Sequence, residues 1–188
     1  MPDKKNRQSL LKKWIIKQHN GQLIKGNDQP YFNHLERVAE MAEPFAYMRF
    51  ETGICHDLFE KTGVTAPELY QNLLDIGYAL YEAGLITINV IELTDSFTKS
   101  KFPKLSQVER KNKEWQRLAN TNSTVQTVKY ADLYDNVIWM VKHDRANALS
   151  YLQRKLIHVK TLTIGNFQLR QELLNLINSE LSILKEAV

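Results

Sequence analysis

The sequence predicts an all-α protein, and three observations support that expectation. Glycine and proline number only 7 and 5 among 188 residues, so the frequent tight turns of a β fold are disfavoured. Apolar side chains recur three or four positions apart along most of the chain, which is helical spacing. Two Ser/Thr-x-x-Glu capping boxes, beginning at Thr65 and Ser106, mark the starts of helices. We therefore expect one domain over residues 1–188, a helical bundle of about eight or nine helices.

The first third of the chain carries three helical patterns. Residues 5–18 are amphipathic, with lysines and arginines between the apolar positions. Residues 20–30 are rich in glycine, asparagine and aspartate, a composition typical of a loop. A second apolar stripe begins at Leu35, and residues 49–60 form the third pattern.

The middle of the chain is expected to hold two further helices and a loop. The capping box at Thr65 begins a helix that should run to about Glu82, with Gly84 breaking it. Residues 86–93 are apolar and β-branched, so a strand and a helix both fit. Helix is favoured there because no partner strand is visible elsewhere. Residues 94–104 are polar and read as a loop.

The last part of the chain predicts a run of helices. Ser106 begins one that reaches Leu118, and a polar break separates it from the next, over residues 125–141. Residues 143–158 and 166–187 carry two more apolar patterns, which should complete the bundle.

Composition limits the classes of protein and partner. Hydrophobic residues make up 43% and charged residues 24%, as in folded globular proteins. The single cysteine, Cys55, excludes an internal disulfide and favours a reducing, cytoplasmic location. No apolar run is long enough for a membrane span and no secretory signal is visible, so no membrane partner is expected. The net charge of +4 allows a phosphate-bearing ligand but is too small to indicate nucleic acid. The oligomeric state is not predicted.

The adjacent pair His56-Asp57, within an apolar run, is the most unusual local feature. Neighbouring helical residues point about 100° apart, so both side chains can reach one ion between them. Glu60 is i+4 from His56 and shares this face. Imidazole and carboxylate groups are ligands for zinc, manganese or iron. The alternative is a buried histidine satisfied by the neighbouring aspartate.

Two more candidate ligands stand on other predicted helices. His34 and Asp132 also lie among apolar residues, as do His56 and Asp57. Helix bundles often build metal sites from inward-pointing side chains on different helices. Two neutral imidazoles and two carboxylates would neutralise a divalent cation and leave coordination positions for water, whose pKa the metal would lower.

Short motifs follow one another over about residues 12–140. They are Lys17-Gln18-His19, Pro30-Tyr31-Phe32-Asn33-His34, His56-Asp57-Leu58-Phe59-Glu60, Leu93-Thr94-Asp95, Glu109-Arg110-Lys111 and Tyr130-Ala131-Asp132 with Asn136. In this order they resemble the HD superfamily of metal-dependent phosphohydrolases. The resemblance is closest to the RelA/SpoT-type alarmone hydrolases and their small stand-alone members.

The resemblance implies an all-helical domain that removes the 3′-pyrophosphate from guanosine tetra- or pentaphosphate, usually with manganese. The family's metal ligands would correspond to His34, His56, Asp57 and Asp132. A pair of acidic residues serves the attacking water and the proton transfers in the family. Here Glu60 matches its first member and Lys61 replaces the second. Lys61 cannot act as a base unless burial favours its neutral form, so it either steadies negative charge on phosphate or points to solvent.

The resemblance also implies a nucleotide pocket. Asn136 matches the family's asparagine near the last metal ligand, and Lys25 fits a basic residue that holds the nucleotide. Leu23 and Ile24 stand where the family tends to carry arginine, which lysine does not replace as a planar stacking group.

Three other candidates have structural alternatives. Arg110 and Lys111 are candidates for phosphate contacts or for a solvated helix face, and Tyr31 for a base contact or the core. Two other functions remain open beside the one that the resemblance implies. They are hydrolysis of a different nucleotide, and nucleotide binding without strong catalysis.

Overall fold

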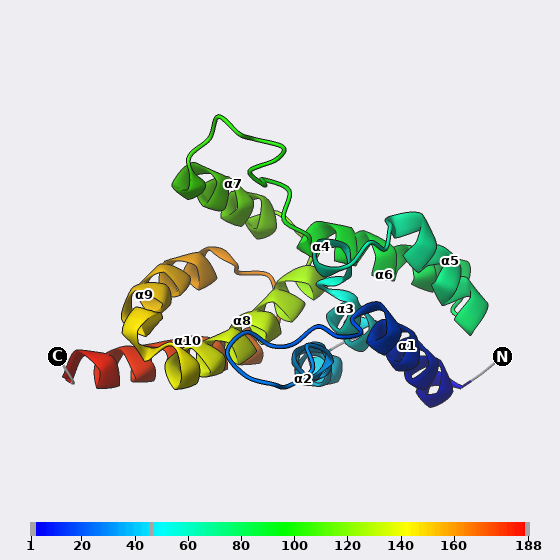
Figure 1. Ribbon diagram of the computed structural model, residues 1–188, viewed down its shortest axis with the longest axis horizontal. Coiled ribbons are helices and arrows are strands. Elements are labelled where there is room, and N and C mark those ends of the chain that lie inside the picture. Colours follow the sequence, from blue (N-terminus) through cyan, green and yellow to red (C-terminus); the bar gives the residue numbers. More distant parts are fainter. Residues whose placement is uncertain (1–2, 46, 187–188) are drawn as a thin grey trace. The chain divides into compact units, whose positions relative to one another are not determined.

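The computed structural model describes residues 3–45 and 47–186, and its helices are joined by loops (Figure 1). The one β feature in these ranges is an isolated antiparallel bridge between Leu23 and Pro30. This confirms the predicted all-α class. None of the described helices has both the length and the hydropathy that a bilayer crossing requires.

The chain divides into two compact units, which we call unit 1 (Met1–Thr94) and unit 2 (Asp95–Val188). The single-domain expectation stays a prediction. The helices of unit 1 are α1 (Lys4–Gln18), α2 (Phe32–Ala42), the 3₁₀ turn η1 (Glu43–Phe45), α3 (Arg49–Cys55), α4 (Leu58–Lys61), α5 (Ala66–Ile76) and α6 (Leu80–Leu93). Those of unit 2 are α7 (Gln107–Ala119), α8 (Ser123–His143), α9 (Arg145–Thr161) and α10 (Phe167–Glu186).

Most predicted boundaries hold, but the break between α5 and α6 was misplaced. The capping box at Thr65 is present, since the Thr65 amide and hydroxyl both donate to Glu68. The helix ends at Gly77, with φ of 103°, and Gly84 lies inside α6. Tyr78 N–H donates to the Leu73 carbonyl at 3.0 Å, and this Schellman closure requires the left-handed conformation that glycine adopts easily.

The helix expected over residues 49–60 is also interrupted. It forms α3 and α4, which are separated at His56 and Asp57, and Asp57 leaves helical geometry with φ −101° and ψ 5°. The two candidate ligands therefore stand at a junction between helices and not on one continuous helix. They still approach one another there, as the geometry below shows.

The core of unit 1 forms around a close contact between α2 and α3. A Cβ placed on Gly53 would lie 2.8 Å from Ala39 Cα, so the two backbones meet where no side chain fits. Leu11 and Ile15 of α1 are fully buried in the same core. Each such side chain contributes about 1.5–3 kcal/mol of hydrophobic stabilisation.

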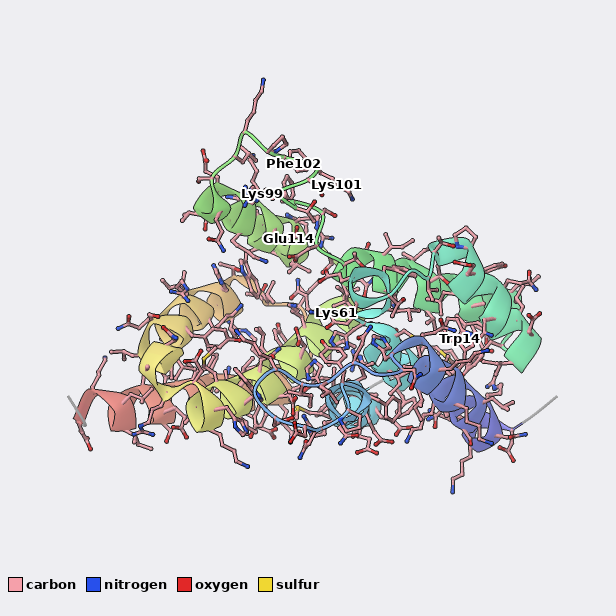
Figure 2. All side chains as sticks on the ribbon, viewed as in Figure 1. Trp14, Lys61, Lys99, Lys101, Phe102 and Glu114 are labelled. Atoms are coloured by element: carbon pink, nitrogen blue, oxygen red, sulfur yellow. The ribbon has the colours of Figure 1, made fainter. Side chains whose placement is uncertain are left out.

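Unit 2 has its own core, in which α10 packs against α8 and α9 (Figure 1). Tyr130 is fully buried, and its hydroxyl donates to the Leu162 carbonyl at 2.9 Å. The loop before α7 is held by the buried Glu114, which accepts hydrogen bonds from the amides of Ser96 and Phe97 at 2.8 and 2.9 Å (Figure 2). α10 ends at Glu186, and residue 187 of the predicted helix lies outside the described residues.

Candidate metal centre

Unit 1 brings His34, His56 and Asp57 together. His34 lies near the start of α2, while the other two form the α3–α4 junction. One ligand atom of each lies within 4.8 Å of the others. The two imidazole rings are 5.2 Å apart between centroids and meet edge to face at 71°. Both histidines are buried and Asp57 is half-buried, so the three groups form an inward-facing cluster.

The backbone fixes the orientation of His56. Its Nδ1 lies 2.8 Å from the Gly53 carbonyl oxygen, and because that oxygen only accepts, Nδ1 carries the proton. In this tautomer Nε2 carries the lone pair, and it lies 3.6 Å from Asp57 Oδ1. A metal-binding histidine is commonly oriented by such a hydrogen bond through its other nitrogen.

Tyr31 connects the metal cluster to the loop before α2. Its hydroxyl donates to Asp57 Oδ2, and its ring centroid lies 5.6 Å from that of His19 and 5.5 Å from that of His34. Burial lowers the pKa of His19 below its ordinary value, which favours a neutral ring. Tyr31 was a candidate for a base contact or for the core. In the structure its hydroxyl donates a hydrogen bond to Asp57, a candidate metal ligand.

Glu60 and Lys61 lie on α4, and both are exposed. The Lys61 ammonium lies 5.6 Å from the centroid of the Tyr31 ring, a cation–π distance. Its carbonyl accepts a hydrogen bond from Gln22 at 2.7 Å. The lysine in the position of the second carboxylate therefore extends over a residue that contacts Asp57.

Asp132, the fourth predicted ligand, belongs to α8 in unit 2. It is buried, with 6% of its surface exposed. Lys129 donates to its Oδ2 at 2.7 Å and Asn136 donates to its Oδ1 at 2.5 Å. Its ligation of the same ion as the histidines stays a prediction, as does the role of Asn136 toward a nucleotide.

The remaining substrate candidates differ in what they touch. Lys25 is exposed in the loop between α1 and α2. Arg110 donates to the Leu105 carbonyl, and Lys111 bonds Asp95 at 2.7 Å. These two cations therefore have partners within the protein, which a phosphate would have to replace or share.

The donor set fits a divalent cation. Two imidazoles and one carboxylate suit manganese, iron or zinc, and a three-residue set leaves coordination positions for water and substrate. The neighbouring Cys55 does not add a thiolate, because complete burial raises the pKa of its thiol far above the ordinary value. Cys55 is a fully buried residue of the core.

One cluster in unit 2 was missed. His158 is half-buried and stacks on Trp115 with centroids 4.3 Å apart. Burial, followed by the nearby Lys155, lowers the pKa of His158 to about 4. The sequence feature that could have indicated this cluster is the spacing of Tyr151, Lys155 and His158, which places all three on one face of a helix.

Comparison with known proteins supports the fold. No model of a known protein family matches the chain, and no curated protein matches it. A solved structure does match, described as a metazoan ortholog of SpoT that hydrolyzes ppGpp and plays a role in starvation responses. The TM-score is 0.76 at 20% identity, over 95% of this chain and 97% of the other. The two chains therefore share their helical fold over nearly their whole length.

Proposed function

We propose that this chain is a metal-dependent phosphohydrolase that removes the 3′-pyrophosphate of guanosine tetra- or pentaphosphate. The observation that carries the proposal is the convergence of His34, His56 and Asp57 within 4.8 Å. That cluster occurs in a fold shared with a protein described as hydrolysing ppGpp. The chemistry of the donor set and the chemistry of that relative agree.

The proposed ligands are the three residues of unit 1 together with Asp132. A divalent ion, which we propose to be Mn²⁺, supplies Lewis acidity that polarises a phosphoryl oxygen and makes water a better nucleophile. Tyr31 holds Asp57 through its hydroxyl, and the Gly53 carbonyl holds His56 in the ligating tautomer. Glu60, one turn beyond His56, takes a proton from the attacking water.

The nucleotide is proposed to bind beside the ion through Lys25 and Asn136, with Arg110 or Lys111 on its phosphates. Lys25 is exposed, so it can follow a phosphate without losing an internal partner. We expect Lys25→Ala and Asn136→Ala each to weaken binding of the nucleotide that is turned over. Unchanged affinity in both variants would contradict this placement.

A second candidate is hydrolysis of a different nucleotide, and it rests on Lys61 and Ile24. The Lys61 ammonium over the Tyr31 ring stands where the resemblance expects a carboxylate. Ile24 is 8% exposed and apolar where the resemblance expects arginine, so no planar cation is available there to stack on guanine. Nucleotide binding with weakened catalysis is the third candidate.

The deciding experiment is turnover of a nucleotide panel, including guanosine tetraphosphate, by the full chain with Mn²⁺. Release of pyrophosphate from guanosine tetraphosphate supports the first proposal, and release from another member supports the second. Measured binding without any turnover supports the third.

The variant Lys61→Asp refines the result. Faster turnover of guanosine tetraphosphate would mean that the lysine has moved the chain away from that substrate. Slower turnover of its own substrate would mean that the lysine contacts the phosphates. An unchanged rate on both would make Lys61 a surface residue.

A further inference from the structure

Lys155 of α9 lies close to two aromatic side chains of unit 2. Its ammonium lies 5.1 Å from the ring centroid of Trp115 and 5.1 Å from that of Tyr151. The side chain is partly buried. Within residues 3–45 and 47–186, no carboxylate reaches ion-pairing distance of this ammonium. Two rings therefore lie at cation–π distance from the ammonium, and no carboxylate of the described residues forms an ion pair with it.

The charged groups around Lys155 leave an excess of positive charge. The carboxylates that influence it are Asp132 and Asp95. Lys129 already bonds the first at 2.7 Å, and Lys111 already bonds the second at 2.7 Å. Three ammonium groups thus face two carboxylates, and Lys155 is the one without an ion pair.

The pKa values of Lys155 and His158 are both lowered in this environment. Burial, followed by the nearby charge of Lys129, lowers the pKa of Lys155 to about 8. Arg154 and Lys155 both contribute to the lowered pKa of His158. At neutral pH the lysine remains mostly charged, so its environment favours a ligand that brings negative charge.

We propose that Lys155, with Lys129 beside it and the rings of Trp115 and Tyr151 as walls, binds a phosphate or diphosphate group. Lysine binds phosphate as a point charge, and a multiply charged anion matches the local excess. Asp132, one of the proposed metal ligands, adjoins Lys129, so the phosphate lies beside that ligand. That the phosphate belongs to a nucleotide rests on the proposed function, whereas phosphate binding itself requires no hydrolysis.

The first test is pyrophosphate binding to the full chain, measured by calorimetry at fixed low salt. Removing one charged donor should lower affinity about tenfold or more, so Lys155→Met should bind correspondingly weaker while Lys155→Arg keeps part of the affinity. Lys160→Met is the matched control, because it removes an equal charge from an exposed position of the same helix. Equal affinity of Lys155→Met and the unmodified chain would overturn the proposal.

The second test needs no substitution and therefore does not depend on a variant's folding. The full chain is treated at pH 8 with an amine-reactive acylating reagent, with and without pyrophosphate, and modification of Lys155 and Lys160 is followed by peptide mass spectrometry. Pyrophosphate should slow modification of Lys155 about tenfold and leave Lys160 unchanged. Equal labelling of Lys155 with and without pyrophosphate would overturn the site.

The two proposals fail in distinguishable ways. Lys155-dependent pyrophosphate binding without nucleotide turnover would leave the phosphate site standing and remove the proposed function. Turnover of guanosine tetraphosphate with the same KM in Lys155→Met, together with no protection of Lys155 by pyrophosphate, would remove the phosphate site. The proposed function would then still stand.

Discussion

In unit 1 the polar groups around the candidate site are two imidazoles and a carboxylate, whereas in unit 2 they are lysines around an aspartate. Asp57 accepts a hydrogen bond from the neutral hydroxyl of Tyr31. Asp132 is already paired with the Lys129 ammonium. Unit 1 is therefore suited to a cation, and unit 2 to an anion.

This difference separates two proposed binding functions, one for a cation in unit 1 and one for an anion in unit 2. Metal affinity should depend mainly on unit 1, and phosphate affinity mainly on unit 2. Variants that affect one affinity and spare the other test the separation directly.

The largest effect is expected from His56→Ala. Loss of an imidazole ligand should remove bound Mn²⁺ and lower turnover on the order of 10³-fold, as loss of the Lewis acid implies. Metal content by elemental analysis and turnover of guanosine tetraphosphate measure the two effects. His143→Ala, which changes an exposed histidine of α8, is the control.

Asp132→Asn shows how much of the metal affinity unit 2 supplies. We expect it to keep part of the bound metal, because the three ligands of unit 1 remain. If Asp132→Asn lost the metal as completely as His56→Ala, metal affinity would depend equally on residues of both units. That result would contradict the assignment of metal affinity mainly to unit 1.

The next effect concerns Glu60 alone. Glu60→Gln keeps the shape of the side chain but cannot take a proton, so turnover should fall about 10²–10⁴-fold while metal content stays unchanged. Glu40→Gln, at an exposed position of α2, should leave both quantities unchanged. An unchanged rate in Glu60→Gln would remove this residue from the proton transfer.

A smaller effect tests how unit 1 holds its carboxylate. Tyr31→Phe keeps the ring against His19 and His34 but removes the donor to Asp57. Loss of such a partner commonly costs 10–100-fold, so Mn²⁺ affinity by calorimetry should fall about tenfold. Tyr70→Phe controls for the loss of a hydroxyl elsewhere in unit 1. Equal Mn²⁺ affinities of Tyr31→Phe and the unmodified chain would assign Tyr31 to the substrate alone.

The smallest effect is a pH dependence of stability from unit 2. The folded pKa of His158 is lowered to about 4 from an ordinary 6.5, so the unfolded chain takes up the proton first as the pH falls. Stability should therefore decrease between pH 6.5 and 4, by about 2 kcal/mol after allowance for partial exposure. His158→Phe should flatten this part of the urea-unfolding profile, and His143→Phe should not. An identical slope in both variants would contradict the assignment.

The sequence predicted the helices because helix signals are local. The grouping of His34 with His56 and Asp57 depends instead on the packing of α2 against α3, and it was expected from the family resemblance. The capping box at Ser106 is present, since the Glu109 amide donates to its hydroxyl and the Ser106 amide donates back to the Glu109 carboxylate. The choice between Gly77 and Gly84 as a helix end was not decidable in this way. Both glycines follow apolar runs, and only the closure by Tyr78 selects the first.

The unit 2 cluster required information that spacing does not carry. A single helix face through Lys155 and His158 is visible in the sequence, but their stacking partner Trp115 stands on another helix. Its position depends on how α7 and α9 pack, which no local pattern specifies. Buried polar groups paired across helices are for this reason harder to predict than helix caps.

The contact at Gly53 also limits how this sequence can change over generations. A Cβ at this position would meet the backbone of Ala39 at 2.8 Å, so any substitution separates α2 from α3. That movement would carry His34 away from His56 while leaving both histidines in the sequence. A lineage that lost the glycine would therefore keep every proposed ligand in its sequence and lose the close approach that the proposed metal centre requires.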